Sequence, residues 1–213
     1  MNILPEQIII GAGTEYLYQL LLQLFPGDAL FCLENPGYPK LSTIYRENHR
    51  ALCYADLDQE GIRMDTIKRL DPQILHISPT HHFPTGKVTS IARRYELLNW
   101  AHNNVHRYII EDDYDSEFRL NGRLIPTLAS IDQTQSVIYM NTFSKSLAST
   151  IRISYMVLPL PLLTIFKTRL SYLSSTVSNF EQYTLAKFIR DGYFERHINR
   201  MRTYYKKHRK AIS

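Results

Sequence analysis

The chain has 213 residues, of which 44% are hydrophobic and 21% are charged, and these proportions are those of an ordinary globular protein. The formal net charge of +5 is concentrated in the segment 196–210, which we interpret as a solvated basic helix in preference to a DNA-binding surface. No stretch is apolar enough to cross a bilayer, and the start has no basic segment followed by an apolar one. We therefore expect a soluble protein that is neither secreted nor membrane-bound.

The two cysteines and the paired histidines do not indicate a metal site. Cys32 and Cys53 lie in apolar, strand-like runs without a Cys or His at ligand spacing, which favours reduced core thiols and a cytoplasmic location. His81 and His82 have no carboxylate or further histidine at the spacing that a metal requires. We expect no bound metal.

Short apolar runs alternate with longer helical patterns, which predicts an α/β fold with a mostly parallel sheet. In chain order we predict a strand at 7–10, a helix at 15–25, a strand at 29–33, a helix at 41–48, strands at 51–55 and 74–78, a helix at 91–103, strands at 108–112, 137–141 and 153–158, and helix from 161 onward. No linker or repeat interrupts the pattern, so residues 1–213 form one domain. Both ends are abrupt, which suggests a piece of a longer protein.

The first strand runs into the sequence Gly-Ala-Gly-Thr at residues 11–14, directly before a helix. Glycines there allow an anion to approach the backbone, and the helix that follows presents free N–H groups. The same pattern is equally compatible with a simple tight turn. A dinucleotide fingerprint needs a small residue where Tyr16 stands, and the Walker motif is absent.

An acidic cluster follows the strand at 108–112, at the edge of the sheet where ligands bind in open α/β folds. We interpret Glu111 and Asp115 as parts of a solvent-facing turn. Asp112, at the end of a buried strand, is better explained if it faces a cation or a protonated ring nitrogen.

Hydroxyls and a lysine follow the strand at 137–141, in the run Thr-Phe-Ser-Lys-Ser at residues 142–146. Lys145 is either a surface residue or an amine suited to Schiff-base chemistry. Arg152 opens the next strand, and its guanidinium is able to hold a phosphate through two parallel hydrogen bonds.

These segments together resemble fold-type-I pyridoxal-phosphate enzymes, and more narrowly the aminotransferase-like domain of the MocR family of GntR-type transcriptional regulators. The runs IGAGTEYL at 10–17, YIIEDDYDSEF at 108–118 and TFSKSL at 142–147 carry the resemblance, with NPGY at 35–38 and PTG at 84–86. It covers essentially the whole chain and implies a three-layer fold, the large domain of a fold-type-I aminotransferase.

The resemblance also implies pyridoxal 5′-phosphate as the cofactor and assigns roles to residues. Lys145 would hold the cofactor covalently, Asp112 would keep its ring nitrogen protonated, and Tyr114 would bind the ring hydroxyl. Tyr38 would stack on the ring. The phosphate would be bound by Ala12, Gly13, Thr14, Thr142 and Arg152.

Three departures from the resembling proteins stand out. Phe83 takes the place of the asparagine that precedes Pro-Thr-Gly in many aminotransferases, a change that the MocR group generally shares. Ser149 and Thr150 stand where the family usually has Pro-Gly, so we expect backbone strain near Arg152. The small C-terminal domain and the N-terminal DNA-binding domain of resembling proteins are absent from the sequence.

Three functions remain open at this stage. The domain is a sensor that binds pyridoxal phosphate together with an amine or amino acid and passes the change to a DNA-binding domain. Alternatively, it is a catalytically active aminotransferase. The third possibility is an inactive truncated product. The resemblance favours the sensor and implies a homodimer, with DNA contacted only through the missing N-terminal domain.

Overall fold

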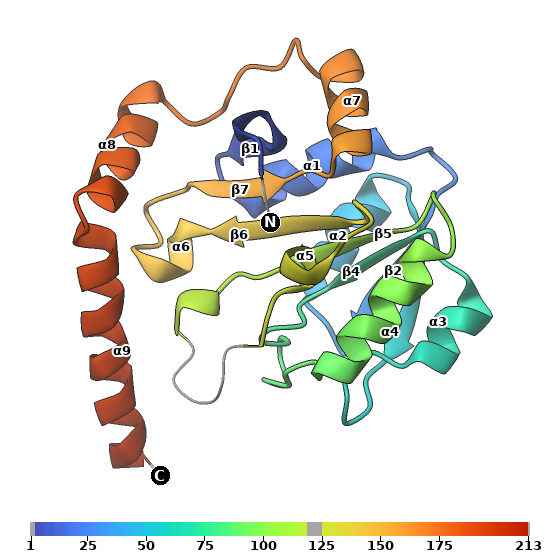
Figure 1. Cartoon of the computed structure of the whole chain (residues 1–213), viewed down its shortest axis with the longest axis horizontal. Coiled ribbons are helices and arrows are strands. Elements are labelled where there is room, and N and C mark those ends of the chain that lie inside the picture. The colour runs from blue at the N-terminus through green and yellow to red at the C-terminus, as the bar shows by residue number, and fades with distance from the viewer. Residues whose placement is uncertain (1–2, 119–124, 213) are drawn as a thin grey trace.

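The computed structural model describes residues 3–118 and 125–212, and in that part of the chain seven strands form one sheet (Figure 1). The strands are β1 (Ile8–Gly11), β2 (Leu30–Asn35), β3 (Ala51–Asp56), β4 (Ile74–Ile77), β5 (Tyr108–Asp112), β6 (Val137–Thr142) and β7 (Ser154–Val157). Their order across the sheet is β1-β7-β6-β5-β4-β2-β3.

The helices of the described residues pack on both faces of this sheet and extend beyond one end of it (Figure 1). They are α1 (Thr14–Leu24), α2 (Pro39–Glu47), α3 (Met64–Leu70), α4 (Ile91–His102), α5 (Leu128–Ile131), α6 (Phe143–Ser146), α7 (Leu160–Arg169), α8 (Asn179–Arg190) and α9 (Tyr193–Ile212), with short 3-10 turns η1 (Pro5–Gln7) and η2 (Ser116–Phe118).

Strand direction confirms the predicted mostly parallel sheet. The ladders β2·β3, β2·β4, β4·β5 and β5·β6 are parallel, whereas β7 runs antiparallel to both β6 and β1. The carboxyl ends of β4, β5 and β6 therefore lie at the same edge, and the residues that follow them are brought together there.

Two hydrophobic cores lie on opposite faces of the sheet, which makes the fold a three-layer α/β sandwich. Residues of α1, α2 and α7 pack on one face and residues of α3, α4 and α5 on the other. Successive strand residues alternate between the two cores, as Ile109 and Ile110 do in β5. Burial on both faces explains why these strands read as continuous apolar runs in the sequence.

Several short helices were not predicted, and the C-terminal region is not continuously helical. The helices α3, α5 and α6 have only one or two turns, too few to give a periodic pattern. The segment 170–178 separates α7 from α8, and Ser178 caps α8 in a reciprocal arrangement with Glu181. The prediction of helix from 161 to the end was therefore wrong over 170–178 and at the turn 191–192 between α8 and α9.

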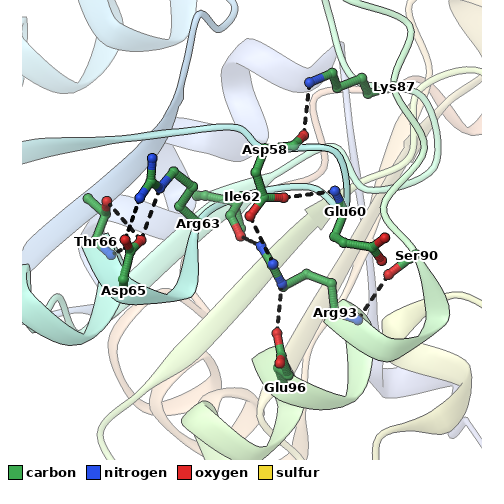
Figure 2. A network of polar contacts seen from close by, with 10 residues as sticks. All are labelled: Asp58, Glu60, Ile62, Arg63, Asp65, Thr66, Lys87, Ser90, Arg93 and Glu96. Atoms are coloured by element: carbon green, nitrogen blue, oxygen red, sulfur yellow. Dashed lines mark hydrogen bonds and ion pairs between the residues drawn. The ribbon is translucent and has the colours of Figure 1, made fainter.

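Arg93 of α4 ties the loop after β3 to the helix layer (Figure 2). Its guanidinium donates to Asp58 Oδ2 at 3.0 Å, to Glu96 Oε2 at 2.7 Å and to the carbonyl oxygen of Ile62. The backbone N–H of Arg93 also donates to the capping Ser90 hydroxyl at 3.2 Å. This network fixes the start of α4 to the loop between β3 and α3.

The helices α8 and α9 extend along one side of the molecule (Figure 1). No residue of α8 is buried, whereas α9 contacts the rest of the protein through Ile198, through Phe194 against Phe143, and through Tyr205 against Phe118. Arg196, Arg200, Lys206 and Lys207 of α9 are exposed, whereas Arg202 is partly buried and donates to the carbonyl oxygen of Glu117; the side chains of Arg209 and Lys210 lie outside the described residues. Among the described residues, no helix is long and apolar enough to span a membrane.

Candidate functional site

A cavity of about 380 Å³ opens at the carboxyl edge of the central strands. It brings together residues from α1, the turn before α2, the ends of β5 and β6, α6 and the segment before β7. Seven of the nine predicted site residues line it: Thr14, Tyr38, Asp112, Tyr114, Thr142, Lys145 and Arg152. The two others, Ala12 and Gly13, directly precede Thr14 in the sequence but do not line the cavity.

Ala12 and Gly13 form the turn that leads into α1. The N–H of Ala12 donates to Thr176 Oγ1 at 2.9 Å and is therefore already engaged within the protein. Gly13 has a φ of 95°, which favours glycine, and a Cβ atom there would collide with the guanidinium of Arg152. Gly11 is needed for a different reason, because a Cβ would lie 2.6 Å from Tyr16 and 2.8 Å from Leu17. The two glycines thus let α1 and Arg152 approach the first strand closely.

Asp112 sits at the end of β5 with only 8% of its surface exposed. Its Oδ2 accepts a hydrogen bond from the Tyr18 hydroxyl and lies 3.5 Å from Nε2 of His76. The other side of the His76 ring contacts Tyr45, whose hydroxyl lies 2.7 Å from Nδ1. Oδ1 of Asp112 is buried without a hydrogen-bond partner among the described residues. A buried carboxylate oxygen with no donor is a place where a ligand is able to supply one.

Tyr114 lines the cavity beside an acidic group and a histidine. Burial and the nearby carboxylates of Asp115, Asp112 and Glu34 raise the pKa of the Tyr114 phenol. Its ring stacks on that of His81 at 6.1 Å between centroids, and Nδ1 of His81 in turn is hydrogen-bonded to the carboxylate of Asp115. Tyr114 is therefore a neutral hydrogen-bonding phenol at physiological pH.

Lys145 lies in the short helix α6 and its side chain is exposed to the cavity. Within the part of the chain that the structure describes, its ammonium group forms no hydrogen bond and no ion pair. The helix is capped by Thr142, whose Oγ1 accepts from the N–H of Ser144 at 3.3 Å and from Ser154 Oγ at 2.8 Å. The lysine therefore stands on a rigid turn, with its amine uncommitted.

Two aromatic side chains form an outer wall of the cavity. Tyr38 and Phe83 meet edge to face with 5.8 Å between ring centroids, and both are nearly half exposed. Phe83 thus forms part of the cavity wall at the position where many aminotransferases have an asparagine. An exposed aromatic pair of this kind offers a flat apolar surface to a planar ring.

A smaller space of about 30 Å³ lies behind this wall, and sequence reasoning did not predict its acidic residue. Glu34 lines it together with His76 and Asp112. Oε2 of Glu34 accepts from the N–H of Ser78 at 2.8 Å, and burial raises its pKa to about 8. Burial therefore favours the protonated form of Glu34, which lowers the negative charge around the smaller space.

The prediction for Glu111 was wrong. Glu111 does not lie in a solvent-facing turn: it is fully buried, pairs with Arg94 at 3.3 Å, and accepts from the N–H groups of Leu128 and Ala129 at 2.9 Å. Asp115, by contrast, is half-buried and paired with His81.

The backbone strain that we expected at 149–150 is absent. The non-glycine residues with positive φ among those described are elsewhere, at 49, 71 and 135.

Three residues of the site were missed because their sequence context gave little signal. Tyr18 and Glu15 lie on α1, in a run of leucines and tyrosines that reads as core, and Glu34 is the last buried residue of β2. The one sequence signal for Tyr18 was its spacing of four residues from Thr14, which places both side chains on the same face of the helix. Among the described residues no cluster of His, Cys, Asp or Glu is arranged to hold a metal ion.

The sequence matches the family described as aminotransferase class I and II over residues 1–213. The chain belongs to this family. Its relatives include the uncharacterized HTH-type transcriptional regulator YdeL of Bacillus subtilis, 45% identical over 98% of this chain and 45% of the relative. The probable rhizopine catabolism regulatory protein MocR of Rhizobium meliloti is 32% identical over 98% of this chain and 42% of its own length.

Solved aminotransferases share the fold of this family member. A multiple substrate aminotransferase from Thermococcus profundus superposes with a TM-score of 0.84 at 26% identity, covering 96% of this chain and 53% of that one. A Pyrococcus horikoshii kynurenine aminotransferase, solved with PMP and kynurenine, gives 0.85 at 26% identity with the same coverage. The chain is thus an aminotransferase-like domain homologous to MocR-type regulators, and it spans about half the length of the relatives it matches.

Proposed function

We propose that this chain binds pyridoxal 5′-phosphate in the 380 Å³ cavity and serves as the effector-binding part of a MocR-type transcriptional regulator. One observation carries the proposal: the uncommitted amine of Lys145 and the unpartnered Oδ1 of Asp112 line the same cavity as Arg152. A lysine amine, a buried acid and a guanidinium are the groups that a phosphorylated pyridine aldehyde needs.

The residues present fit this cofactor. Arg152 and the start of α1 supply positive charge for a phosphate, and glycine at position 13 leaves room for the guanidinium. The free Oδ1 of Asp112 is available to a protonated ring nitrogen. The cavity is also large enough for one ligand of this size, at the lower end of the usual range for small-molecule sites.

Each predicted site residue then has a role that its surroundings support. Lys145 binds the cofactor covalently, and Asp112, held by Tyr18 and His76, keeps the ring nitrogen protonated. Tyr114 hydrogen-bonds the ring hydroxyl, and Tyr38 packs on the ring. The phosphate is bound by Thr14, Thr142 and Arg152; the backbone at Ala12 and Gly13 joins them when its N–H groups leave Thr176 and Gly11, to which they donate in this structure. When bound, the cofactor supplies an electron-withdrawing ring that labilises bonds at the carbon of an attached amine.

Regulation is favoured over turnover as the role of the longer protein. Relatives that match nearly all of this chain at 45% and 32% identity are named as regulators, whereas the aminotransferase structures are 26% identical. In this proposal an amine or amino acid is the effector, residues 1–213 belong to one aminotransferase large domain, and DNA is contacted through a separate N-terminal domain. We also propose a homodimer in the cytoplasm.

The test is the visible absorption band of the lysine-bound cofactor. Adding pyridoxal 5′-phosphate to the wild-type chain is expected to produce the band, and Lys145→Ala is expected to lose it. Lys187→Ala, which replaces an exposed lysine of α8, is the matched control and keeps the band. No band in the wild-type chain would overturn cofactor binding.

A panel of amino acids separates the sensor from the enzyme once the band is present. A lasting spectral change on addition of an amino acid, without release of a keto acid, supports the sensor. Stoichiometric conversion to the pyridoxamine form with release of a keto acid supports an active aminotransferase instead.

A further inference from the structure

The carboxylate of Glu15 stands between two cations at the wall of the cavity. Oε2 accepts a hydrogen bond from Nη2 of Arg152 at 2.7 Å, and Oε1 is paired with the ammonium group of Lys40. The three side chains come from α1, from α2 and from the segment before β7. The side chain of Glu15 is 30% exposed, and those of Lys40 and Arg152 are about half exposed.

This carboxylate lies where the protein is best suited to bind an anion. Glu15 belongs to the first turn of α1, whose N-terminus carries partial positive charge. A Cβ on Gly13 would lie 2.9 Å from Oε2 of Glu15 and would collide with the Arg152 guanidinium. The bare glycine, the helix N-terminus and the arginine therefore already face one negative charge, and that charge belongs to the chain itself.

Glu15 is ionised throughout the physiological range. Partial burial raises its pKa, but the hydrogen bond from Lys40, its own backbone N–H and the charges of Arg152 and Lys40 outweigh this effect and lower the pKa to about 2. The two cations thus leave one net positive charge, not two, to attract a phosphate.

We propose that Glu15 is a built-in competitor of the phosphate group and sets how tightly the cavity binds it. The proposal rests on the proposed function, because the phosphate is that of the bound cofactor. A phosphate that reaches Arg152 must share the guanidinium with the Glu15 carboxylate or displace it. Two anions bound to one guanidinium lie close together and repel each other. Lys40, released or shared, becomes a second cation for the phosphate. The result is weaker binding of phosphate than the arginine and the helix N-terminus alone would give.

A different role for Glu15 predicts an effect of the opposite sign. If the carboxylate only holds Arg152 in the orientation that phosphate needs, removing its charge weakens phosphate binding. If Glu15 competes with phosphate, the same change strengthens binding. A neutral side chain of the same size therefore distinguishes the two roles.

The experiment compares Glu15→Gln with the wild-type chain. Inorganic phosphate is titrated against each protein by calorimetry, and the dissociation constants of pyridoxal 5′-phosphate and of pyridoxal are measured in parallel. We expect Glu15→Gln to bind inorganic phosphate roughly tenfold more tightly and to raise the preference for pyridoxal 5′-phosphate over pyridoxal by a similar factor. Glu47→Gln, an exposed glutamate of α2, is the control and leaves both values unchanged.

The readouts keep this inference apart from the proposed function. Tighter phosphate binding by Glu15→Gln supports the inference even if no band of lysine-bound cofactor forms. Unchanged or weaker phosphate binding by Glu15→Gln overturns it even if the band forms, and so does the absence of phosphate binding in both proteins.

Discussion

The hydroxyl of Tyr18 donates to Oδ2 of Asp112 across 94 residues of sequence, at 2.5 Å. Tyr18 lies in the middle of α1 and Asp112 at the end of β5, so this bond joins the first helix to the strand that carries the acid of the site. Both groups are buried, and the carboxylate in turn raises the pKa of the phenol beyond the effect of burial. The bond aims the free Oδ1 of Asp112 by holding its partner oxygen.

Replacing Tyr18 by phenylalanine is expected to destabilise the fold by about 1–3 kcal/mol. The change leaves a buried carboxylate oxygen with His76 as its nearest polar neighbour, and an unsatisfied buried acceptor costs that much. Urea unfolding measures the difference. Tyr183→Phe, at a phenol that is 76% exposed, is the matched control and leaves the midpoint in place. Equal midpoints for Tyr18→Phe and wild type would mean that the bond contributes nothing.

Breaking the Arg94–Glu111 pair is expected to cost about 3–5 kcal/mol of unfolding free energy, because Glu111 and the buried carbonyl oxygens to which Arg94 donates lose their partner. Both side chains are fully buried. Arg94→Leu removes the cation and leaves the carboxylate with only the two backbone N–H groups that hold the start of α5. Chemical denaturation compares this variant with Lys187→Leu.

Lys187 forms an ion pair with Asp191 on the surface of α8, where its side chain is 68% exposed. Solvent screens such a pair, so the Lys187→Leu variant is expected to unfold close to wild type. Similar losses in the two variants would contradict the view that burial makes the Arg94 pair important.

Glu34 is expected to make the protein less stable as pH rises from 4.5 to 8, the ordinary and raised values of its pKa. Across this range the folded state keeps a proton that the unfolded state releases, so the contribution is fully present at the acid end and is lost toward the alkaline end. The slope from one such group is at most about 1.4 kcal/mol per pH unit.

Glu34→Gln removes this slope, and urea unfolding at intervals across the range measures it. The raised pKa of Glu111, about 7, contributes a similar slope that remains in both proteins and cancels in the difference. Glu47→Gln serves as the control because its carboxylate is exposed. Parallel pH profiles for wild type and Glu34→Gln would show that Glu34 ionises normally.

Thr150→Gly restores the residue usual in the family and is expected to lower stability by about 0.5–1 kcal/mol. The backbone at Thr150 has no positive φ, so glycine relieves no strain there and only adds freedom to the unfolded chain. Thermal unfolding checks the direction. A higher melting temperature for the variant would reveal strain at this position.

The succession of strands along the chain and the edge of the sheet that holds the cavity followed from the sequence, because each central strand is buried on both faces and ends in polar residues. The strand Tyr108–Asp112 was predicted with the bounds that the structure has. What could not be predicted were partners distant in sequence. Four acidic residues within five positions look like a solvent-facing turn, and the burial of Glu111 depends on Arg94, which only the packing of α4 brings to it.

The antiparallel pairing of β1 with β7 gives the anion site an unusual dependence on chain closure. Glu15 and Arg152 are separated by 137 residues, and β1 is an edge strand held in the sheet by β7 alone. The parallel strands β2 to β6 pair with one another without β1 or β7, although Met156 of β7 and the leucines of α1 share the core on one face of the sheet. Closing so long a loop is entropically costly and tends to come late in folding. The proposed phosphate site is therefore expected to form late in folding, and a fragment that lacks either Glu15 or Arg152 is expected to lose it.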